Sequence, residues 1–173
     1  MRKILKQNFF NRDTKIVAKD LLGKFIIRKI GGKEISAMIT ETEAYDGPQD
    51  LASHASKGRT KRTEIMFGHP GYFYVYLCYG MHYMLNVVVG KKDYPAAILI
   101  RGLDKAVGPG RVTKFIRIDK KFNGKIAIPK SNLCFEDRGV KIPKNKIKKT
   151  PRIGVDYSGP VWSKKNFRFV IKD

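Results

Sequence analysis

The sequence has few features of membrane-spanning, secreted or metal-dependent proteins. No apolar run approaches the roughly 20 residues needed to span a bilayer, and Met1–Lys6 returns to charge too soon for the apolar part of a signal peptide. Its two cysteines, Cys78 and Cys134, lie in unrelated contexts without a CxxC spacing. These features indicate an intracellular, reduced protein with neither a disulfide framework nor a metal cage.

Motifs for metal or nucleophilic catalysis are also absent. His54, His69 and His82 are far apart in sequence, and neither an HExxH pattern nor a cysteine cluster accompanies them. There is no nucleophile elbow, and the glycines around Pro109 do not form a Walker or dinucleotide fingerprint. We therefore expect no bound metal.

Acidic residues are scarce relative to basic ones. The 173 residues include 36 Lys and Arg but only 15 Asp and Glu, which gives a formal charge of +21. Such a charge favours a polyanionic partner, with nucleic acid first and a membrane surface or a ribosome behind it. The length fits a single domain over residues 1–173 with a core that needs no disulfides.

The first third of the chain predicts a helix followed by two strands. Asn11–Gly23 suits a short helix capped by Asp13, and Lys24–Ile30 suits a strand that ends at a glycine turn. The next strand carries Ile35, Ala37, Ile39, Glu41, Glu43 and Tyr45 on one face. Acids that continue an inward face lie near a pocket, although pairing with lysines at a sheet edge explains them equally well.

The middle of the chain is rich in tyrosine and histidine. Pro48 can open a short helix that runs through His54. A histidine taken alone, such as His54, is more often structural than catalytic. The basic loop Gly58–Thr63 either contacts phosphates or is simply solvated. Tyr72, Tyr74 and Tyr76 share one face of a strand, as a stacking platform for bases or as ordinary packing residues. Tyr79-Gly80 predicts a hairpin tip that could present an aromatic wedge to a duplex.

The remaining segments carry single polar residues and much positive charge. Asn86 interrupts an apolar strand, where it can simply satisfy backbone groups. Arg101 ends a buried strand as a salt-bridge partner, a phosphate clamp or both. Gly108–Arg111 predicts a loop entering a helix. Lys141–Lys149 is either a DNA-facing surface or a mobile solvated loop, and Phe167–Ile171 suits a final strand.

A carboxylate beside aromatic rings on a cationic protein is compatible with hydrolysis of a glycosidic bond. A series of motifs in one order then resembles the alkyladenine (3-methyladenine) DNA glycosylase family over nearly the whole chain. These motifs are Glu41-Thr-Glu-Ala-Tyr45, Asp50-Leu-Ala-Ser-His54, Met66-Phe-Gly68, Tyr74-Val-Tyr76, Tyr79-Gly-Met-His82, Asn86-Val-Val88, Ala96-Ala-Ile-Leu-Ile-Arg101 and Pro151-Arg-Ile-Gly-Val155.

The resemblance implies a mixed α/β (α+β) fold, a single compact domain with a curved, mostly antiparallel sheet and flanking helices. It implies a monofunctional enzyme of base excision repair without a metal or organic cofactor. The roles that it implies are Glu43 as the base that activates water, Arg101 beside that water, Tyr45 against one face of a flipped base, His54 and Tyr76 against the other, Asn86 excluding guanine, and Tyr79 as the wedge.

The implied partner is double-stranded DNA with alkylated or deaminated purines, and we expect a monomer. The location would be the cytoplasm or nucleoid of a bacterium, or the nucleus of a eukaryote. Two alternatives differ in chemistry. A non-catalytic nucleic-acid-binding module would use the tyrosine strand as a stacking platform, and a glycosylase with lyase activity would form a Schiff base through a lysine.

Overall fold

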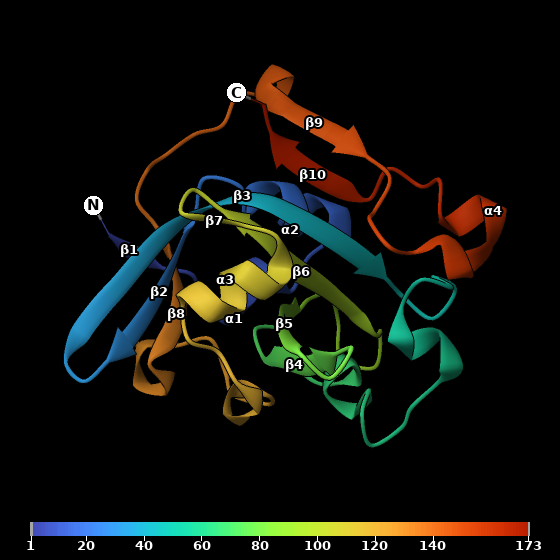
Figure 1. The fold of residues 1–173 in the computed structure, drawn as a ribbon, viewed down its shortest axis with the longest axis horizontal. Helices are drawn as coiled ribbons and strands as arrows, with labels where there is room; N and C mark the ends of the chain where they lie inside the picture. The colour runs from blue at the N-terminus through green and yellow to red at the C-terminus, as the bar shows by residue number, and fades with distance from the viewer. Residues whose placement is uncertain (1, 173) are drawn as a thin grey trace.

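The fold was determined as a computed structural model that describes residues 2–172. A ten-stranded sheet forms its centre, with the main strand order β1-β8-β2-β3-β6-β5-β4. The strand pairs among the described residues are antiparallel, and the strands curve around helix α3 (Figure 1). The strands are β1 Lys3–Ile4, β2 Phe25–Ile30, β3 Lys33–Asp46, β4 Phe73–Cys78, β5 His82–Val88, β6 Ala96–Leu103, β7 Ala106–Val107, β8 Leu133–Asp137, β9 Ile147–Thr150 and β10 Arg168–Ile171.

Short helices accompany the sheet, so the predicted mixed α/β fold is confirmed. None of the helices in the described part of the chain is long and apolar enough to cross a membrane. The α-helices are α1 Gln7–Phe10, α2 Thr14–Asp20, α3 Pro109–Phe115 and α4 Gly159–Trp162, and the 3-10 helices are η1 His54–Lys57, η2 Glu64–Phe67, η3 Lys120–Phe122, η4 Pro129–Ser131, η5 Lys144–Lys146 and η6 Asp156–Ser158.

The two faces of the sheet pack against different hydrophobic clusters. Cα partners in neighbouring strands share a face, and the register aligns Ala44, Ile98, Val87 and Phe73 across β3, β6, β5 and β4. These residues are buried in the main hydrophobic core, with residues of α2 and α3. The other face holds a second, smaller cluster that includes Tyr74 and Tyr76.

The predicted continuous inward face of β3 is wrong. Ala37 and Ile39 lie in the main core, but beyond them Ala44 takes the core position. The register between β3 and β6 shifts on both sides of Glu41, so that Glu41 lies opposite Gly102 and Thr42 lies opposite Ile100. Such a β-bulge changes which residues face the core. The acids therefore point away from the main core, toward the second face.

Two helix predictions also need correction. The helix predicted from Asn11 forms only over α2, although Asp13 caps it by accepting the Ile16 N–H at 2.9 Å, and Ile16 itself is exposed. The helix predicted from Pro48 to His54 does not form, because residues 47–52 form turns and η1 begins only at His54.

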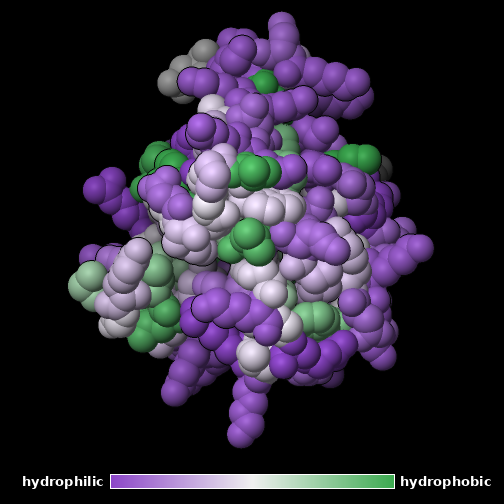
Figure 2. Space-filling model, turned by 90° about the vertical axis from the view of Figure 1, so that its right-hand side faces the viewer, coloured by the Kyte–Doolittle hydropathy of each residue, from purple (hydrophilic) through white to green (hydrophobic). Residues whose placement is uncertain are grey.

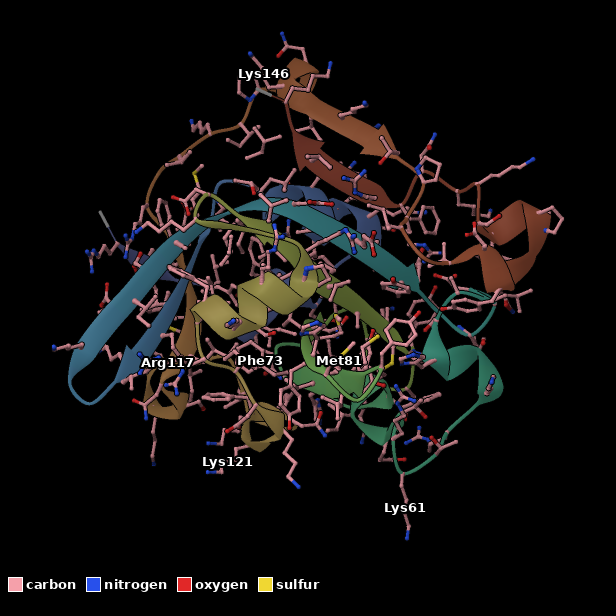
Figure 3. The ribbon with its side chains drawn as sticks, viewed as in Figure 1. Lys61, Phe73, Met81, Arg117, Lys121 and Lys146 are labelled. Atoms are coloured by element: carbon pink, nitrogen blue, oxygen red, sulfur yellow. The ribbon has the colours of Figure 1, made fainter. Side chains whose placement is uncertain are left out.

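The predicted hairpin between β4 and β5 is present. Cys78 pairs with His82, and Tyr79 and Gly80 at the tip have φ angles of 51° and 67°. Consecutive left-handed residues give a turn whose twist matches the flanking strands. Figure 3 shows Met81 at this hairpin and Phe73 at the other end of β4, within the body of the molecule.

Candidate active site

A cleft of about 1140 Å³ opens on the second face of the sheet. Its lining includes Glu43 and Tyr45 from β3, Tyr76 from β4, His54 from η1 and Arg101 from β6. Figure 2 views the side of the molecule that carries α4, where hydrophilic surface surrounds separate hydrophobic patches. The structure thus brings together six of the seven predicted site residues in one lining, including Tyr79, whereas Asn86 is not part of this lining.

Glu43 is the acid at the base of the cleft, and it is fully buried. Its Oε1 accepts the backbone N–H of Ile153 at 2.9 Å, and its Oε2 accepts the Tyr45 hydroxyl at 3.0 Å. Burial raises the pKa of Glu43, and the Arg101 guanidinium, whose Nε lies 3.5 Å from Oε1, opposes that rise. The carboxylate is therefore held in one orientation, with a pKa moved toward that of a useful general base.

Glu41 has a different environment, although it is also buried. Its Oε1 lies 3.0 Å from Nε of Arg101 and accepts a hydrogen bond from Nε of Arg168 at 2.5 Å. Two guanidinium groups on one carboxylate hold β3, β6 and β10 together. The sequence left open whether the two acids pair with lysines at a sheet edge; in fact Glu41 pairs with arginines inside the sheet.

Arg101 reaches both acids because of its place in the bulge. Glu41 pairs with Gly102 and Thr42 with Ile100, which leaves Arg101 as the extra residue of β6. A bulge re-aims the side chain of its extra residue. Gly102 is required here, because a Cβ at this position would lie 2.8 Å from Cβ of Glu41.

The aromatic side chains line the cleft above Glu43. The rings of His54 and Tyr76 meet edge to face with centroids 4.6 Å apart, and His54 Nδ1 lies 3.0 Å from the Tyr74 hydroxyl. Burial, together with the smaller effects of the nearby cations Arg62 and Lys57, lowers the pKa of His54 to about 4. The imidazole is therefore uncharged at neutral pH.

Tyr74 does not belong to an exposed row of tyrosines. Its ring is 2% exposed and is held by the contact to His54, whereas Tyr76 faces the cleft. The three tyrosines therefore do not present the stacking platform that one interpretation of the sequence required.

Asn86 lies outside the main cleft, in a recess of about 30 Å³ that shares Tyr45, His54 and Tyr76 with it. Its Nδ2 donates to the Tyr74 carbonyl at 3.1 Å, and the side chain is buried. Asn86 therefore hydrogen-bonds to a backbone group, which is the structural role that the sequence left open for it.

Tyr79 lies at the rim of the cleft, and its side chain is 89% exposed. A ring fixed at a tight hairpin tip, without cover from its own protein, is free to contact another molecule.

A segment near the C-terminus contributes site residues that sequence reasoning missed. Arg152 forms a fully buried bidentate ion pair with Asp50, and its guanidinium carbon lies 4.7 Å from the centroid of the Tyr45 ring. The Tyr157 hydroxyl donates to the Ala52 carbonyl at 2.7 Å, and Tyr157 lines both the cleft and the recess. Residues 151–155 carried part of the family resemblance, but no local pattern assigned them a role.

A buried carboxylate at the base of a ring-lined cleft, with an exposed ring at its rim and a cationic surface, has the features expected of the class of DNA glycosylases. Comparison with known proteins identifies the particular family. The family model described as methylpurine-DNA glycosylase (MPG) matches residues 8–107 and 103–173. The chain belongs to the methylpurine-DNA glycosylase family.

Individual relatives agree with this assignment. A protein of Legionella pneumophila (strain Paris) is 45% identical, over 100% of this chain and 96% of the relative. Proteins of Anaeromyxobacter sp. (strain Fw109-5) and Methanocella arvoryzae are 40% and 41% identical, over 97% and 90% of this chain and 89% and 86% of the relatives. All three carry the name "Putative 3-methyladenine DNA glycosylase". The predicted family is confirmed.

Proposed function

We propose that this protein removes 3-methyladenine and related alkylated or deaminated purines from double-stranded DNA by hydrolysing the bond between the base and C1′ of the sugar. Glu43 acts as the general base that deprotonates the attacking water. The observation that carries this proposal is the fully buried Glu43 carboxylate, fixed by Ile153 and Tyr45 at the base of the cleft.

Arg101 supports the same reaction from the opposite side. Its Nε lies 3.5 Å from the Glu43 carboxylate, so the guanidinium lowers the pKa of Glu43 and partly offsets the larger, opposite effect of burial. Where the leaving group is a cationic alkylated purine, it departs readily. Modest help from one base and one cation is therefore sufficient, and no cofactor enters the scheme.

The aromatic side chains hold the extruded base. Tyr45 stacks on one face of the base, and His54 and Tyr76 contact the other. An electron-poor, positively charged purine stacks well on aromatic rings. The uncharged state of His54 supports this assignment, because a protonated imidazole would repel a cationic lesion. Asn86, in the recess behind these rings, excludes guanine by clashing with its 2-amino group.

Tyr79 fills the gap that the extruded nucleotide leaves in the duplex. Its exposed ring at the hairpin tip and its place at the cleft rim support the role of a wedge inserted through the minor groove. One such face binds one continuous duplex, so we propose a monomer that acts on DNA inside the cell.

The decisive experiment measures base release from a duplex with a single hypoxanthine or ethenoadenine. Wild type should release the base, whereas Glu43→Gln should be slower by roughly 10²–10⁴-fold, the contribution typical of a general base, and should still bind the lesion duplex. Glu41→Gln is the matched control, since it removes the neighbouring buried charge and should weaken the fold more than the chemistry.

Each of the other outcomes has a definite meaning. Loss of activity in Glu41→Gln but not in Glu43→Gln would show that the wrong acid has been assigned. Lesion-selective binding without release by wild type would favour the non-catalytic module. Lys57 lines the cleft and is the amine to consider for a lyase; borohydride should trap no covalent adduct if water is the nucleophile.

A further inference from the structure

A furrow that shares no lining residue with the cleft runs along another side of the molecule. Its larger hollow, about 680 Å³, lies between α2 and the segment at residues 140–149. A second hollow of about 460 Å³ continues it beside β1, and the two share Phe9 and Asp137. Figure 1 shows the loop that leads into β9 on the opposite side of the molecule from α4. We call this track the basic furrow.

Positive charge dominates the basic furrow. The larger hollow is lined by Lys19, Lys24, Lys141, Lys144 and Lys149. The second hollow adds Lys3, Lys6 and Arg12.

The acids of the basic furrow do not cancel this charge. They are Asp20 and Asp137, and each already pairs with a furrow cation: Arg12 at 2.9 Å from Asp20, and Lys24 at 2.8 Å from Asp137. Six of the eight basic side chains therefore remain in excess. The lesion cleft, in comparison, has three basic side chains and the carboxylate of Glu43.

The lysines of the furrow wall sit on an anchored segment. Ile142 packs against the main core and fits over Gly23, where a Cβ would lie 3.0 Å from its Cγ1. The Lys172 N–H donates to the Lys146 carbonyl at 2.8 Å, and β9 pairs with β10. Figure 3 shows Lys146 at the outer tip of this segment. Of the two interpretations of Lys141–Lys149, the structure supports a fixed cationic surface.

We propose that the basic furrow binds the phosphate backbone of a second, undamaged DNA duplex while the cleft engages the first. The elongated track suits a linear polyanion, since a duplex carries one negative charge per roughly 1.7 Å of its axis. A single phosphate would occupy only one of the two hollows. Lysine point charges contact phosphates without reading sequence, so this binding depends on neither sequence nor lesion.

A second duplex site allows direct transfer between DNA segments. An incoming duplex binds the furrow before the first has left, so the rate of departure from the first should rise with the concentration of the second. An enzyme with one site releases DNA at a rate independent of the competitor.

The experiment follows the protein leaving a labelled, lesion-free duplex at increasing concentrations of unlabelled duplex. The rate at which wild-type protein dissociates from the labelled duplex should rise linearly with the concentration of unlabelled duplex. The triple variant Lys141→Glu, Lys144→Glu, Lys149→Glu changes exposed furrow residues and should reduce that slope on the order of tenfold. Single-turnover base release by the variant should stay within about twofold of wild type, because its cleft is unchanged.

The control variant carries the same charge change elsewhere: Lys33→Glu, Lys121→Glu, Lys130→Glu, at exposed positions outside both hollows. It should keep the wild-type slope. An equal loss in both triple variants, or a wild-type rate independent of competitor, would overturn the proposal. So would furrow-dependent binding to anionic phosphatidylglycerol vesicles with transfer unaffected. Lesion-free DNA keeps this test independent of the role of Glu43.

Discussion

Replacing Asp50 by asparagine should be among the most damaging single changes outside the proposed catalytic residues. Asp50 and Arg152 have side chains that are both 0% exposed. Their two hydrogen bonds measure 2.6 and 2.8 Å, and Nη1 of Arg152 also donates to the Ala44 carbonyl at 2.8 Å. An asparagine keeps the size of the side chain but turns an amide donor toward a guanidinium that can only donate.

The expected cost follows from the burial of both partners. Removing one partner of a buried ion pair leaves an uncompensated charge and destabilises by roughly 3–5 kcal/mol. For a domain of this size each kcal/mol lowers the melting temperature by roughly 2–4 °C, so Asp50→Asn should lower it by roughly 6–20 °C. Because the guanidinium lies against Tyr45, the binding of a lesion duplex should weaken as well.

Thermal and urea unfolding of three variants would measure this effect. Asp20→Asn is the matched control, since Asp20 pairs with Arg12 at 2.9 Å while both side chains are more than a third exposed; its expected cost is at most about 1 kcal/mol. The double variant Asp50→Leu, Arg152→Met removes both charges and should recover much of the lost stability. Equal costs for Asp50→Asn and Asp20→Asn would refute the reasoning.

Three further predictions concern the cleft. Base release should rise as the pH rises through the raised pKa of Glu43. The protonated Glu43 contributes stability that is fully present below its unfolded pKa and is lost as the pH rises through the folded pKa. The urea midpoint of Glu43→Gln should not show this loss. Because the pKa of His54 is depressed in the fold, the free energy of unfolding should fall as the pH falls from about 6.5 to about 4. His54→Gln should make the free energy of unfolding less dependent on pH over this range. Tyr79→Asn, which tolerates the left-handed backbone, should change stability by less than about 0.5 kcal/mol yet weaken lesion-duplex binding by about 1–3 kcal/mol in gel-shift titrations.

The family resemblance assigned most of the cleft residues, and the strand pattern accounts for the placement of some of them. The alternation of side chains along β4 placed Tyr76 on the face of the strand away from the core residues Phe73 and Val75. The glycine at position 80 marked the hairpin that exposes Tyr79. The fold class followed from the family resemblance, and turn signals between short alternating strands agreed with it.

Two decisive features had no local signal. The β-bulge at Arg101 arises from the pairing of two strands, and the alternation within β3 contains no break that announces it. Arg152 lies 102 residues from its partner Asp50. A lone arginine in a basic chain gives no indication that it will be fully buried. Such contacts depend on tertiary packing, which sequence periodicity does not encode.

The cations of the cleft act in different ways on its two central titratable groups, Glu43 and His54. Burial favours the uncharged form of both Glu43 and His54. Arg101 opposes this effect at Glu43, whereas Arg62 and Lys57 add to it at His54. The carboxylate is thus helped to ionise at a pH at which the imidazole is neutral. In the proposed reaction, a cationic purine would then meet an acid that Arg101 helps to ionise and a set of uncharged rings. The cation arrangement that suits the proposed general base would thus also favour a charged lesion over a neutral base.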